Sequence, residues 1–200
     1  MSANLQEQHW SGPEGDAYHE RSPGDAESNY HFFQKALRNS KLQYDANILE
    51  LGCGTGANLL AMQRCFSYPK FTGVDISQAA LDRAPKYVRK VAASILEWEP
   101  DDKWDLVLTK GVLIHVAPAL LDQVYNTIVR ASRRYVLVCE YFCPTPRMIP
   151  YRGKENLLWA RDFAGEIIDR HGLKLVDYGF VSRRDEHPQD DINFWLLEKP

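Results

Sequence analysis

The sequence predicts an α/β fold with a mostly parallel, seven-stranded sheet that ends in a C-terminal antiparallel hairpin. Apolar strand-like stretches alternate with helical stretches over most of the chain, which is typical of a parallel sheet covered by helices on both faces. A glycine-rich turn at 52–56 directly follows the first strand. The last two strand-like stretches, 173–183 and 192–199, have a short connection and no helix between them, so we expect them to pair as a hairpin.

The expected elements begin with a helix at 30–40, in which Phe33 and Leu37 share one face. Ser77 is expected to cap the helix after the second strand, and Pro85 to disturb that helix near its end. The predicted strands before the hairpin are 47–51, 71–77, 87–93, 104–110 and 134–142. The other predicted helices are 57–66, 78–84, 119–132 and 154–170.

The composition suits one globular domain, because 44% of the 200 residues are hydrophobic. A net charge of −3 provides no basic surface for nucleic acid. No apolar run approaches the ~20 residues of a membrane span, and the N-terminus shows no secretory leader. The four cysteines lack paired spacing and are expected to be reduced thiols. We therefore expect a cytoplasmic protein that binds neither nucleic acid nor membranes, in an oligomeric state that the sequence leaves open.

The first 28 residues are polar and rich in Gly and Pro, as in a disordered tail. Trp10 and Tyr18 lie among them, although disordered segments are depleted in aromatic residues. We predict an N-terminal segment, 1–28, that lies over a single domain at 29–200. Two interpretations remain open, because the segment either forms a lid over a ligand or simply docks on the core.

The glycine turn predicts a nucleotide-like cofactor without deciding which one. Gly52, Gly54 and Gly56 form a GxGxG pattern, and Gly52, Gly54 and Ala57 also satisfy the GxGxxA fingerprint of dinucleotide-binding proteins. Gly54 allows a ligand to approach the backbone, and the amides of the following helix point at the crevice. NAD and S-adenosylmethionine are both candidates at this point.

Three further features bear on the choice and together favour S-adenosylmethionine. Glu50 precedes the first glycine by two residues, where its carboxylate attracts an ammonium and repels a pyrophosphate. Asp75 ends the second strand, where a carboxylate accepts hydrogen bonds from ribose hydroxyls with either cofactor. The terminal hairpin is absent from an ordinary dinucleotide domain. Alternatively, Glu50 is a salt-bridged strand end and Asp75 a helix cap.

The chain also resembles a known family over nearly its whole length, from Trp10 to Glu198. The segments that carry the resemblance are ELGCGTGANL, TGVDIS, WDLVLTKGVLIHV, VLVCEY, IPYRG, RDFAGE and LVDYGFV. They look like the methyltransferase family associated with pseudaminic acid biosynthesis, which has the Rossmann-like class I fold of S-adenosylmethionine-dependent methyltransferases. The first two segments are common to that superfamily, whereas LTKGVLIH, PYRG and RDFAGE are more specific.

The resemblance implies the residues of a cofactor site. Those expected around the methionine part are Glu50, Gly52, Cys53, Gly54 and Gly56. Those expected around the ribose and adenine are Asp75, Ile76, Ser94 and Ile95. Thr109 and Lys110 are expected beside the sulfonium, mostly through backbone atoms. Tyr18 and Arg21 are expected to fold over the cofactor together with Trp10.

Acceptors in this fold bind beyond the carboxyl ends of the fourth and fifth strands, which places Lys110, His115, Glu140 and Tyr141 near the methyl group. Glu140 is costly to bury without a partner and is able to orient an acceptor or take its proton. The alternative role of Glu140 is an ion pair with Lys110 or Arg161. His115 is either a base or a buried packing residue. Glu140, His115 and Tyr141 are therefore the candidate catalytic residues.

Tyr151, Arg152 and Arg161 are the candidate substrate-binding residues, from the IPYRG and RDFAGE segments. An arginine over a small-molecule site suits a carboxylate, because its guanidinium forms bidentate pairs. The nonulosonic acids of the resembled pathway carry a carboxylate, so we expect an anionic acceptor. Alternatively, Arg161 pairs within its own helix.

These observations predict an enzyme that transfers a methyl group from S-adenosylmethionine to a small polar metabolite. A sugar-acid derivative of the nonulosonic type or its nucleotide-activated form is the expected acceptor, and an amino acid or a natural-product intermediate is an alternative. No His, Cys and carboxylate cluster has metal-ligand spacing, so no metal is expected. A rival hypothesis from another class is a non-catalytic regulator that binds the cofactor. An NAD-dependent oxidoreductase is disfavoured because no Tyr-x-x-x-Lys pair is found.

Overall fold

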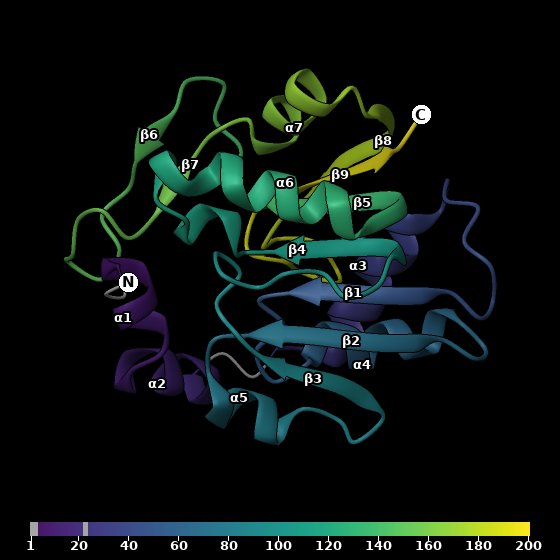
Figure 1. Cartoon of the computed structure of the whole chain (residues 1–200), viewed down its shortest axis with the longest axis horizontal. Coiled ribbons are helices and arrows are strands. Elements are labelled where there is room, and N and C mark those ends of the chain that lie inside the picture. Colours follow the sequence, from purple (N-terminus) through teal and green to yellow (C-terminus); the bar gives the residue numbers. More distant parts are fainter. Residues whose placement is uncertain (1–3, 22–23) are drawn as a thin grey trace.

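The computed structural model describes residues 4–21 and 24–200, and its centre is a seven-stranded sheet with the order β3-β2-β1-β4-β5-β9-β8 (Figure 1). All neighbouring strands are parallel except β9, which runs antiparallel to both β5 and β8. The predicted fold class is therefore confirmed. The strands are β1 (Asn47–Leu51), β2 (Lys70–Asp75), β3 (Val88–Ala92), β4 (Trp104–Lys110), β5 (Ser132–Glu140), β8 (Lys174–Val181) and β9 (Ile192–Glu198).

Helices cover both faces of this sheet. On one face α3 (Ala26–Leu37) and α4 (Ala57–Met62) pack on a core that includes Phe32, Phe33 and Leu59. On the other face α6 (Leu121–Ala131) and α7 (Phe163–His171) pack on a second core (Figure 1). Helix α6 buries residues at 121, 124, 125 and 128, a spacing that puts one apolar stripe on the sheet. Short turns of helix, η1 (Gln63–Cys65), η2 (Leu113–His115) and η3 (Pro118–Leu120), complete the loops.

Side-chain caps fix where several helices begin. Ser77 accepts a hydrogen bond from the Ala80 amide at the start of α5 (Gln78–Arg83), so the predicted cap is confirmed. Asp25 caps α3, and Asp162 caps α7 through the Gly165 amide. The prediction of one helix over 154–170 is wrong in its first half, because α7 begins only after Asp162. The residues before it form bends and a short extended stretch, and the apolar side chains at 157–160 are buried.

Two peripheral pieces lie beside the carboxyl ends of the parallel strands. The N-terminal segment forms two helices, α1 (Leu5–Trp10) and α2 (Pro13–Arg21), rather than a loose tail. Residues 147–160 form an arm that we call the β6–β7 arm, after its two short strands, β6 (Arg147–Met148) and β7 (Trp159–Ala160). Figure 1 shows this arm reaching toward α1. Among the described residues, no helix is long and apolar enough to cross a membrane.

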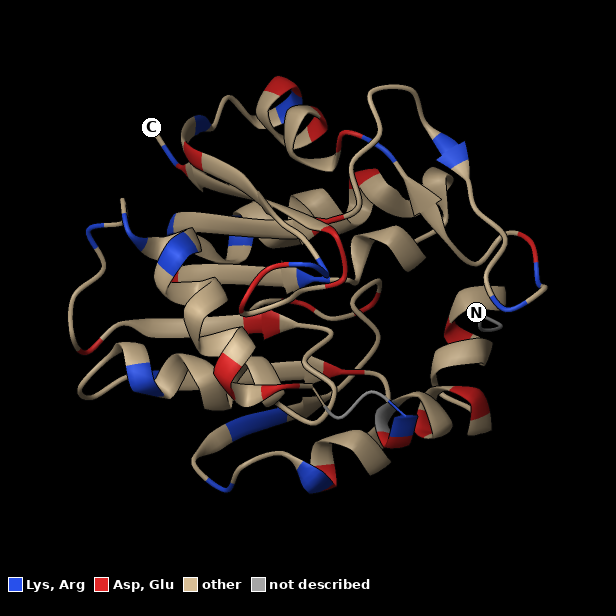
Figure 2. Ribbon diagram, turned by 180° about the vertical axis from the view of Figure 1, so that it is seen from behind, with Lys and Arg blue, Asp and Glu red and all other residues tan. Residues whose placement is uncertain are grey.

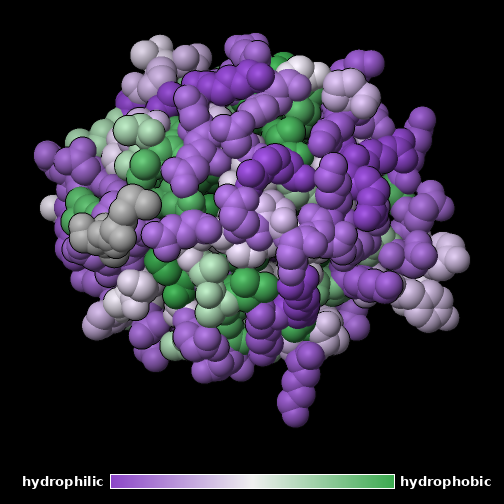
Figure 3. Space-filling view, in the orientation of Figure 1, coloured by the Kyte–Doolittle hydropathy of each residue, from purple (hydrophilic) through white to green (hydrophobic). Residues whose placement is uncertain are grey.

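The distribution of polar and charged residues on the surface follows from this fold. The face seen in Figure 1 is mainly hydrophilic with smaller apolar patches (Figure 3). Viewed from behind, acidic residues occur in several loops on the side of the sheet where α1 and α2 lie (Figure 2). This edge of the sheet therefore combines a helical cover with negatively charged loops.

Gly73 in β2 tests how tightly the glycine turn packs on the sheet. A Cβ atom at this position would lie 2.6 Å from Cys53 Sγ and 3.2 Å from Cys53 Cβ. We expect Gly73→Ala to reduce the free energy of unfolding by about 1–3 kcal/mol, because overpacking displaces the buried cysteine. Thermal and denaturant unfolding measure this loss. Adding Cys53→Ala should recover part of the stability, and a double variant as unstable as Gly73→Ala would contradict the steric explanation.

Candidate active site

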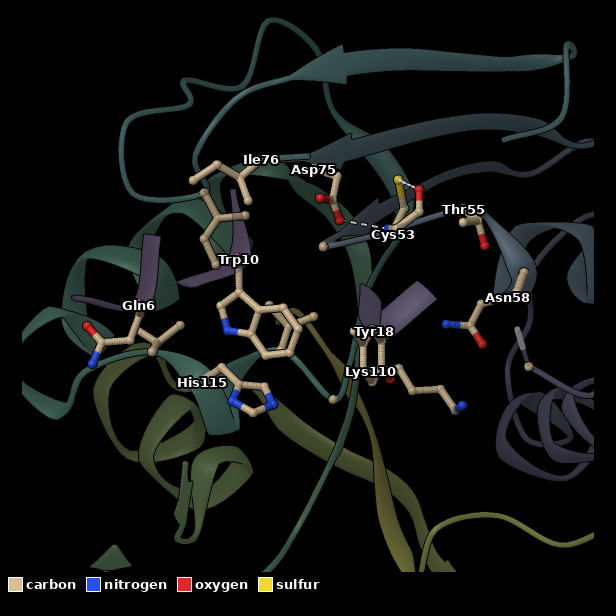
Figure 4. A pocket seen from close by; sticks show the side chains of 18 of the residues that line it. Gln6, Trp10, Tyr18, Cys53, Thr55, Asn58, Asp75, Ile76, Lys110 and His115 are labelled. Atoms are coloured by element: carbon tan, nitrogen blue, oxygen red, sulfur yellow. Dashed lines mark hydrogen bonds between the residues drawn. The ribbon is translucent and has the colours of Figure 1, made fainter. Parts of the chain in front are cut away.

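A cavity of about 500 Å³ opens at the carboxyl ends of β1, β2 and β4, within the usual size range of a small-molecule site. Its lining comes from α1 and α2, the start of α3, the glycine turn with the start of α4, the loops after β2, β3 and β4, and the loop between β8 and β9. Figure 4 shows Trp10 beside His115 at one end and Asn58 with Lys110 at the other. The cavity therefore has an aromatic end and a polar end.

The glycine turn brings backbone to the cavity wall through left-handed conformations. Gly52, Gly54 and Gly56 have φ angles of 72°, 52° and 73°, which favour glycine. A Cβ atom on Gly52 would lie 2.5 Å from a methyl carbon of Val112. The turn is thus wedged against the loop that follows β4 and presents its amide groups at the start of α4.

Asp75 joins this turn to the next one. Its Oδ2 accepts a hydrogen bond from the Gly54 amide at 2.7 Å, and its Oδ1 accepts one from the Ser77 amide at 2.8 Å. Each carboxylate oxygen keeps a further lone pair, since an ionised carboxylate has about four acceptor positions. Asp75 is therefore both a structural brace and an acceptor for ligand hydroxyls at the cavity wall.

Glu50 lies fully buried behind the lining. Its Oε1 accepts a hydrogen bond from Asn58 Nδ2 at 2.6 Å, whereas its Oε2 has no hydrogen-bond partner among the described residues. Burial raises the pKa of Glu50 to about 8, and the nearby Lys110 opposes this rise. A buried carboxylate oxygen without a donor is a costly feature that an added cation would satisfy. This orphaned oxygen fits a ligand that carries an ammonium group.

Glu140 also lies buried, beneath the loop that follows β4. Its two oxygens accept hydrogen bonds from three consecutive backbone amides, those of Val112, Leu113 and Ile114, at 3.1, 3.0 and 3.4 Å. Burial raises the pKa of Glu140 to about 7, and these amides oppose the rise. Glu140 is not part of the cavity lining, so its position supports a role in holding the loop.

His115 stands at the end of that loop, against aromatic rings from two distant segments. Its ring centroid lies 4.6 Å from that of Trp10 and 5.1 Å from that of Tyr151. His115 Nδ1 lies 2.6 Å from the carbonyl oxygen of Leu157, so Nδ1 carries the hydrogen and Nε2 is left as an acceptor. Burial lowers the pKa of His115 to about 4, which keeps the ring neutral at neutral pH.

The polar end of the cavity contains Lys110 and Asp190. Lys110 Nζ donates to Asn29 Oδ1 at 3.3 Å, and burial lowers the pKa of the Lys110 ammonium. Asn29 Oδ1 also accepts a hydrogen bond from Gln189 Nε2. Asp190 accepts a hydrogen bond from the Tyr141 hydroxyl at 2.7 Å. Lys110 is the one lysine or arginine among the described lining residues.

The structure brings part of the predicted site together. The predicted residues that line the cavity are Tyr18, Gly52, Cys53, Gly54, Asp75, Ile76, Ser94, Ile95, Lys110 and His115. Those outside the lining are Arg21, Glu50, Gly56, Thr109, Glu140, Tyr141, Tyr151, Arg152 and Arg161. Glu50 and Glu140 lie directly behind the lining. Glu50 is hydrogen-bonded to the lining residue Asn58, and Glu140 is hydrogen-bonded to the loop after β4. Tyr141 and Tyr151 contact lining residues through a hydrogen bond and a ring contact.

The three arginines lie away from the cavity. Arg161 pairs with Glu166 at 2.6 Å, and both side chains are mostly buried, which matches the alternative that it pairs within its own helix region. Arg152 is exposed at the tip of the β6–β7 arm, and Arg21 is exposed at the end of α2. No guanidinium group is therefore present in the described lining to bind an anionic acceptor.

Several lining residues were not anticipated from the sequence, among them Glu7, Asn29, Asn58, Gln189 and Asp190. Asn58 carried a usable signal, because it lies on the first turn of α4 after the glycine turn. The others come from α1, α3 and the β8–β9 loop, which no local pattern connects to the turn. In the part of the chain that the structure describes, no three His, Cys, Asp or Glu residues are grouped to hold a metal ion.

The fold and this cavity define a Rossmann-like domain that binds a nucleoside-type ligand at the carboxyl ends of its strands. A model of the methyltransferase domain family matches residues 18–173. The chain therefore belongs to the methyltransferase domain family, and the prediction of a methyltransferase that uses S-adenosylmethionine is confirmed at the level of the family.

Solved structures share this fold over the whole chain. Magnesium protoporphyrin IX methyltransferase (ChlM) from Synechocystis PCC 6803, with bound S-adenosylmethionine, has a TM-score of 0.72 at 13% identity and 100% coverage of both chains. The Burkholderia thailandensis 1,6-didemethyltoxoflavin-N1-methyltransferase, with bound 1,6-didemethyltoxoflavin and S-adenosylhomocysteine, has a TM-score of 0.72 at 16% identity, covering 98% of this chain and 87% of that one. At these identities the likeness concerns the fold.

A curated relative, the uncharacterized protein RP789 of Rickettsia prowazekii (strain Madrid E), is 31% identical over 91 residues. The matched region is 41% of this chain and 16% of that protein, so the chain spans a small part of this relative.

The orphaned oxygen of Glu50 predicts that cofactor binding releases a proton. With a pKa of about 8, Glu50 is mostly protonated at pH 7 in the ligand-free protein, and a bound ammonium favours its ionised form. We expect S-adenosylmethionine to release close to one proton at pH 7, and its affinity to rise as the pH increases from about 6 to about 8. Calorimetry in buffers of different ionisation enthalpy measures the release.

Glu50→Gln should abolish this proton release, and the exposed Glu97→Gln should leave it unchanged. Equal heats in all buffers for the wild-type protein would contradict the proposed contact between Glu50 and the ammonium.

Proposed function

We propose that this protein transfers a methyl group from S-adenosylmethionine to a small polar metabolite. The observation that carries the proposal is the cavity itself, where the glycine turn, Asp75 and the orphaned oxygen of Glu50 meet at the carboxyl ends of the parallel strands. Family membership supports the reaction type. The cavity volume of about 500 Å³ suits a cofactor together with a small acceptor.

The cofactor would be held by residues at both ends of the cavity. Glu50 and Asn58 would receive the ammonium, Asp75 the ribose hydroxyls, and the apolar side chains of Ile76 and Ile95 the adenine. When bound, S-adenosylmethionine supplies a methyl group already activated by a sulfonium. The protein's own task is then to align the acceptor and exclude water, which accounts for several kcal/mol in near-attack geometry.

Glu140 and His115 serve this alignment in different ways. By accepting hydrogen bonds from three amides, Glu140 fixes the loop that carries His115, so we assign it a positioning role. The neutral His115 ring offers Nε2 as a hydrogen-bond acceptor to a hydroxyl or amine in the cavity. Tyr141 acts through Asp190, to which its hydroxyl donates.

The finer proposal concerns the acceptor. The resemblance of the IPYRG and RDFAGE segments supports a sugar-acid derivative of the pseudaminic type, or its nucleotide-activated form. Within the lining, Lys110 is the group suited to the carboxylate of such an acceptor. Tyr151 and Arg152 lie on the β6–β7 arm and would contact a larger, nucleotide-linked acceptor rather than the reacting group.

We also propose that α1 and α2 form a lid together with the β6–β7 arm. Gln6 Nε2 donates to the Asn156 carbonyl at 2.6 Å, and Lys154 pairs with Glu14 at 3.1 Å. Trp10 packs against His115, so the lid places its largest ring inside the cavity. These two contacts are polar and exposed, so each is weak. Ring contacts of Tyr151 with His9 and Trp10 also join the arm to α1.

The first test of the proposed function is cofactor binding by calorimetry. S-adenosylmethionine should bind, and NAD should show no measurable binding. Asp75→Ala should weaken S-adenosylmethionine on the order of 10²-fold, because two charge-assisted hydrogen bonds are lost at about 1.5–3 kcal/mol each. Asp75→Asn keeps one acceptor oxygen. Comparing it with Asp75→Ala therefore distinguishes the loss of ligand contacts from the loss of the hydrogen bonds to Gly54 and Ser77. Tighter binding of NAD than of S-adenosylmethionine would overturn the proposal.

Hydrogen exchange tests the lid. Amides of residues 4–21 should exchange more slowly when S-adenosylhomocysteine binds, because the lid then contacts both the arm and the ligand. Lys154→Ala should reduce this protection by removing the pair with Glu14, whereas the exposed Lys174→Ala on the distant β8 serves as the control. Protection that is identical with and without the ligand would show that these helices are a fixed part of the domain.

A further inference from the structure

We propose that Asp190 binds an amino group of the methyl acceptor, so that the protein methylates an amine. This inference rests on the proposed function and names the acceptor's reacting group. Asp190 lies in the loop between β8 and β9 and contributes to the cavity lining. Because β9 is antiparallel to its neighbour β5, the loop before β9 lies at the carboxyl end of β5. Acceptors bind at this edge in open α/β sheets.

The charges of the cavity favour a cation over an anion. Four described lining residues carry carboxylates, Glu7, Asp25, Asp75 and Asp190, against the single ammonium of Lys110. A site with this excess of negative charge raises the local concentration of cationic ligands and repels anions. An acceptor with an amino group therefore suits the cavity better than one whose only charge is a carboxylate.

Three of the four lining carboxylates accept hydrogen bonds at both of their oxygens. Glu7 forms the capping box of α1 and accepts a hydrogen bond from the Ser94 hydroxyl. Asp25 caps α3, and Asp75 braces the glycine turn. Among the described residues, Asp190 accepts a hydrogen bond from the Tyr141 hydroxyl at Oδ2, and its Oδ1 is left as an acceptor.

The surroundings of Asp190 suit an amine. The Tyr141 hydroxyl orients the carboxylate, and the Tyr18 side chain lies in the same lining. Burial raises the pKa of Tyr18 and the Asp190 carboxylate adds to this rise, so the two groups lie within electrostatic reach. A carboxylate beside aromatic rings is a common environment for an ammonium or amine, because both attract positive charge.

The transfer step balances with Asp190 as the proton acceptor. The neutral amine forms a bond from its nitrogen lone pair to the methyl carbon, while the carbon–sulfur bond breaks and its electron pair moves to sulfur. The nitrogen is then an ammonium, and its proton passes to the Asp190 carboxylate and on to water. The products are the methylated amine, S-adenosylhomocysteine and one proton. Asp190, at the exposed rim, has access to water for the last step.

The test measures the binding of small probes to protein saturated with S-adenosylhomocysteine, by ligand-observed nuclear magnetic resonance. The amine probes are glucosamine and tyramine, their hydroxyl counterparts are glucose and tyrosol, and glucuronate is the acidic probe. We expect an amine probe to bind more tightly than its counterpart and than glucuronate. Asp190→Asn should weaken it about tenfold, because a charge-assisted hydrogen bond is lost. S-adenosylhomocysteine affinity should not change in this variant.

Glu186→Gln is the matched control, since Glu186 is an exposed acid in the same loop and does not line the cavity. The inference fails if glucuronate or the hydroxyl probes bind as well as the amines, if neither amine binds to the saturated protein, or if Asp190→Asn and Glu186→Gln bind amines equally. The proposed function fails separately, if S-adenosylmethionine and S-adenosylhomocysteine do not bind at all. Methylation of an amine probe by the wild-type protein, reduced in Asp190→Asn, would support both proposals.

Discussion

Buried carboxylates at the ends of the central strands are the constraint on which the cavity depends. A carboxylate in the core is costly unless donors surround it, so the loops must bring backbone or side-chain N–H groups to Glu50, Asp75 and Glu140. Asp75 ties the glycine turn to the next helix, and Glu140 gathers the amides at 112–114. The loops after β1 and β4 are thereby each fixed by an acid from a neighbouring strand. Because these hydrogen bonds hold the loops in place, the cavity between the loops is already formed without a ligand.

The same constraint sets the electrostatics of the site. Four carboxylates line the cavity, and Lys110 is the one lysine or arginine in the described lining. Glu140 has both oxygens occupied, whereas Glu50 keeps one oxygen without a donor. Glu140 therefore has a structural role, whereas the hydrogen bonding of Glu50 would be completed by a ligand. A cofactor with an ammonium and a sulfonium matches this field, since both groups carry positive charge.

The sequence predicted what depends on local pattern and missed what depends on distant contacts. The strands, the terminal hairpin and the Ser77 cap follow from apolar runs and turn chemistry that lie within a few residues. The partners of Glu140 are backbone amides 26–28 positions earlier in the chain. Every residue type except proline has such an amide, so the sequence does not indicate which amides Glu140 contacts. The sequence predicted a helix that begins at residue 154, whereas α7 begins after Asp162. Arg161 therefore lies just before the helix, where it pairs with Glu166 instead of being free to bind a substrate.

The cover of the cavity has the same non-local origin. Trp10 and Tyr151 are far apart in sequence, yet both pack on the His115 ring, whose tautomer is fixed by a carbonyl of the β6–β7 arm. The arm therefore fixes the side chain that closes the aromatic end, and it is joined to α1 and α2 by ring contacts of Tyr151 as well as by exposed polar contacts. Ring packing contributes apolar contact at the aromatic end, and exposed ion pairs contribute about 0–1 kcal/mol each. The hydrogen bonds of Asp75 and Glu140 involve neither α1, α2 nor the arm, so opening of the proposed lid would leave these buried carboxylates in place.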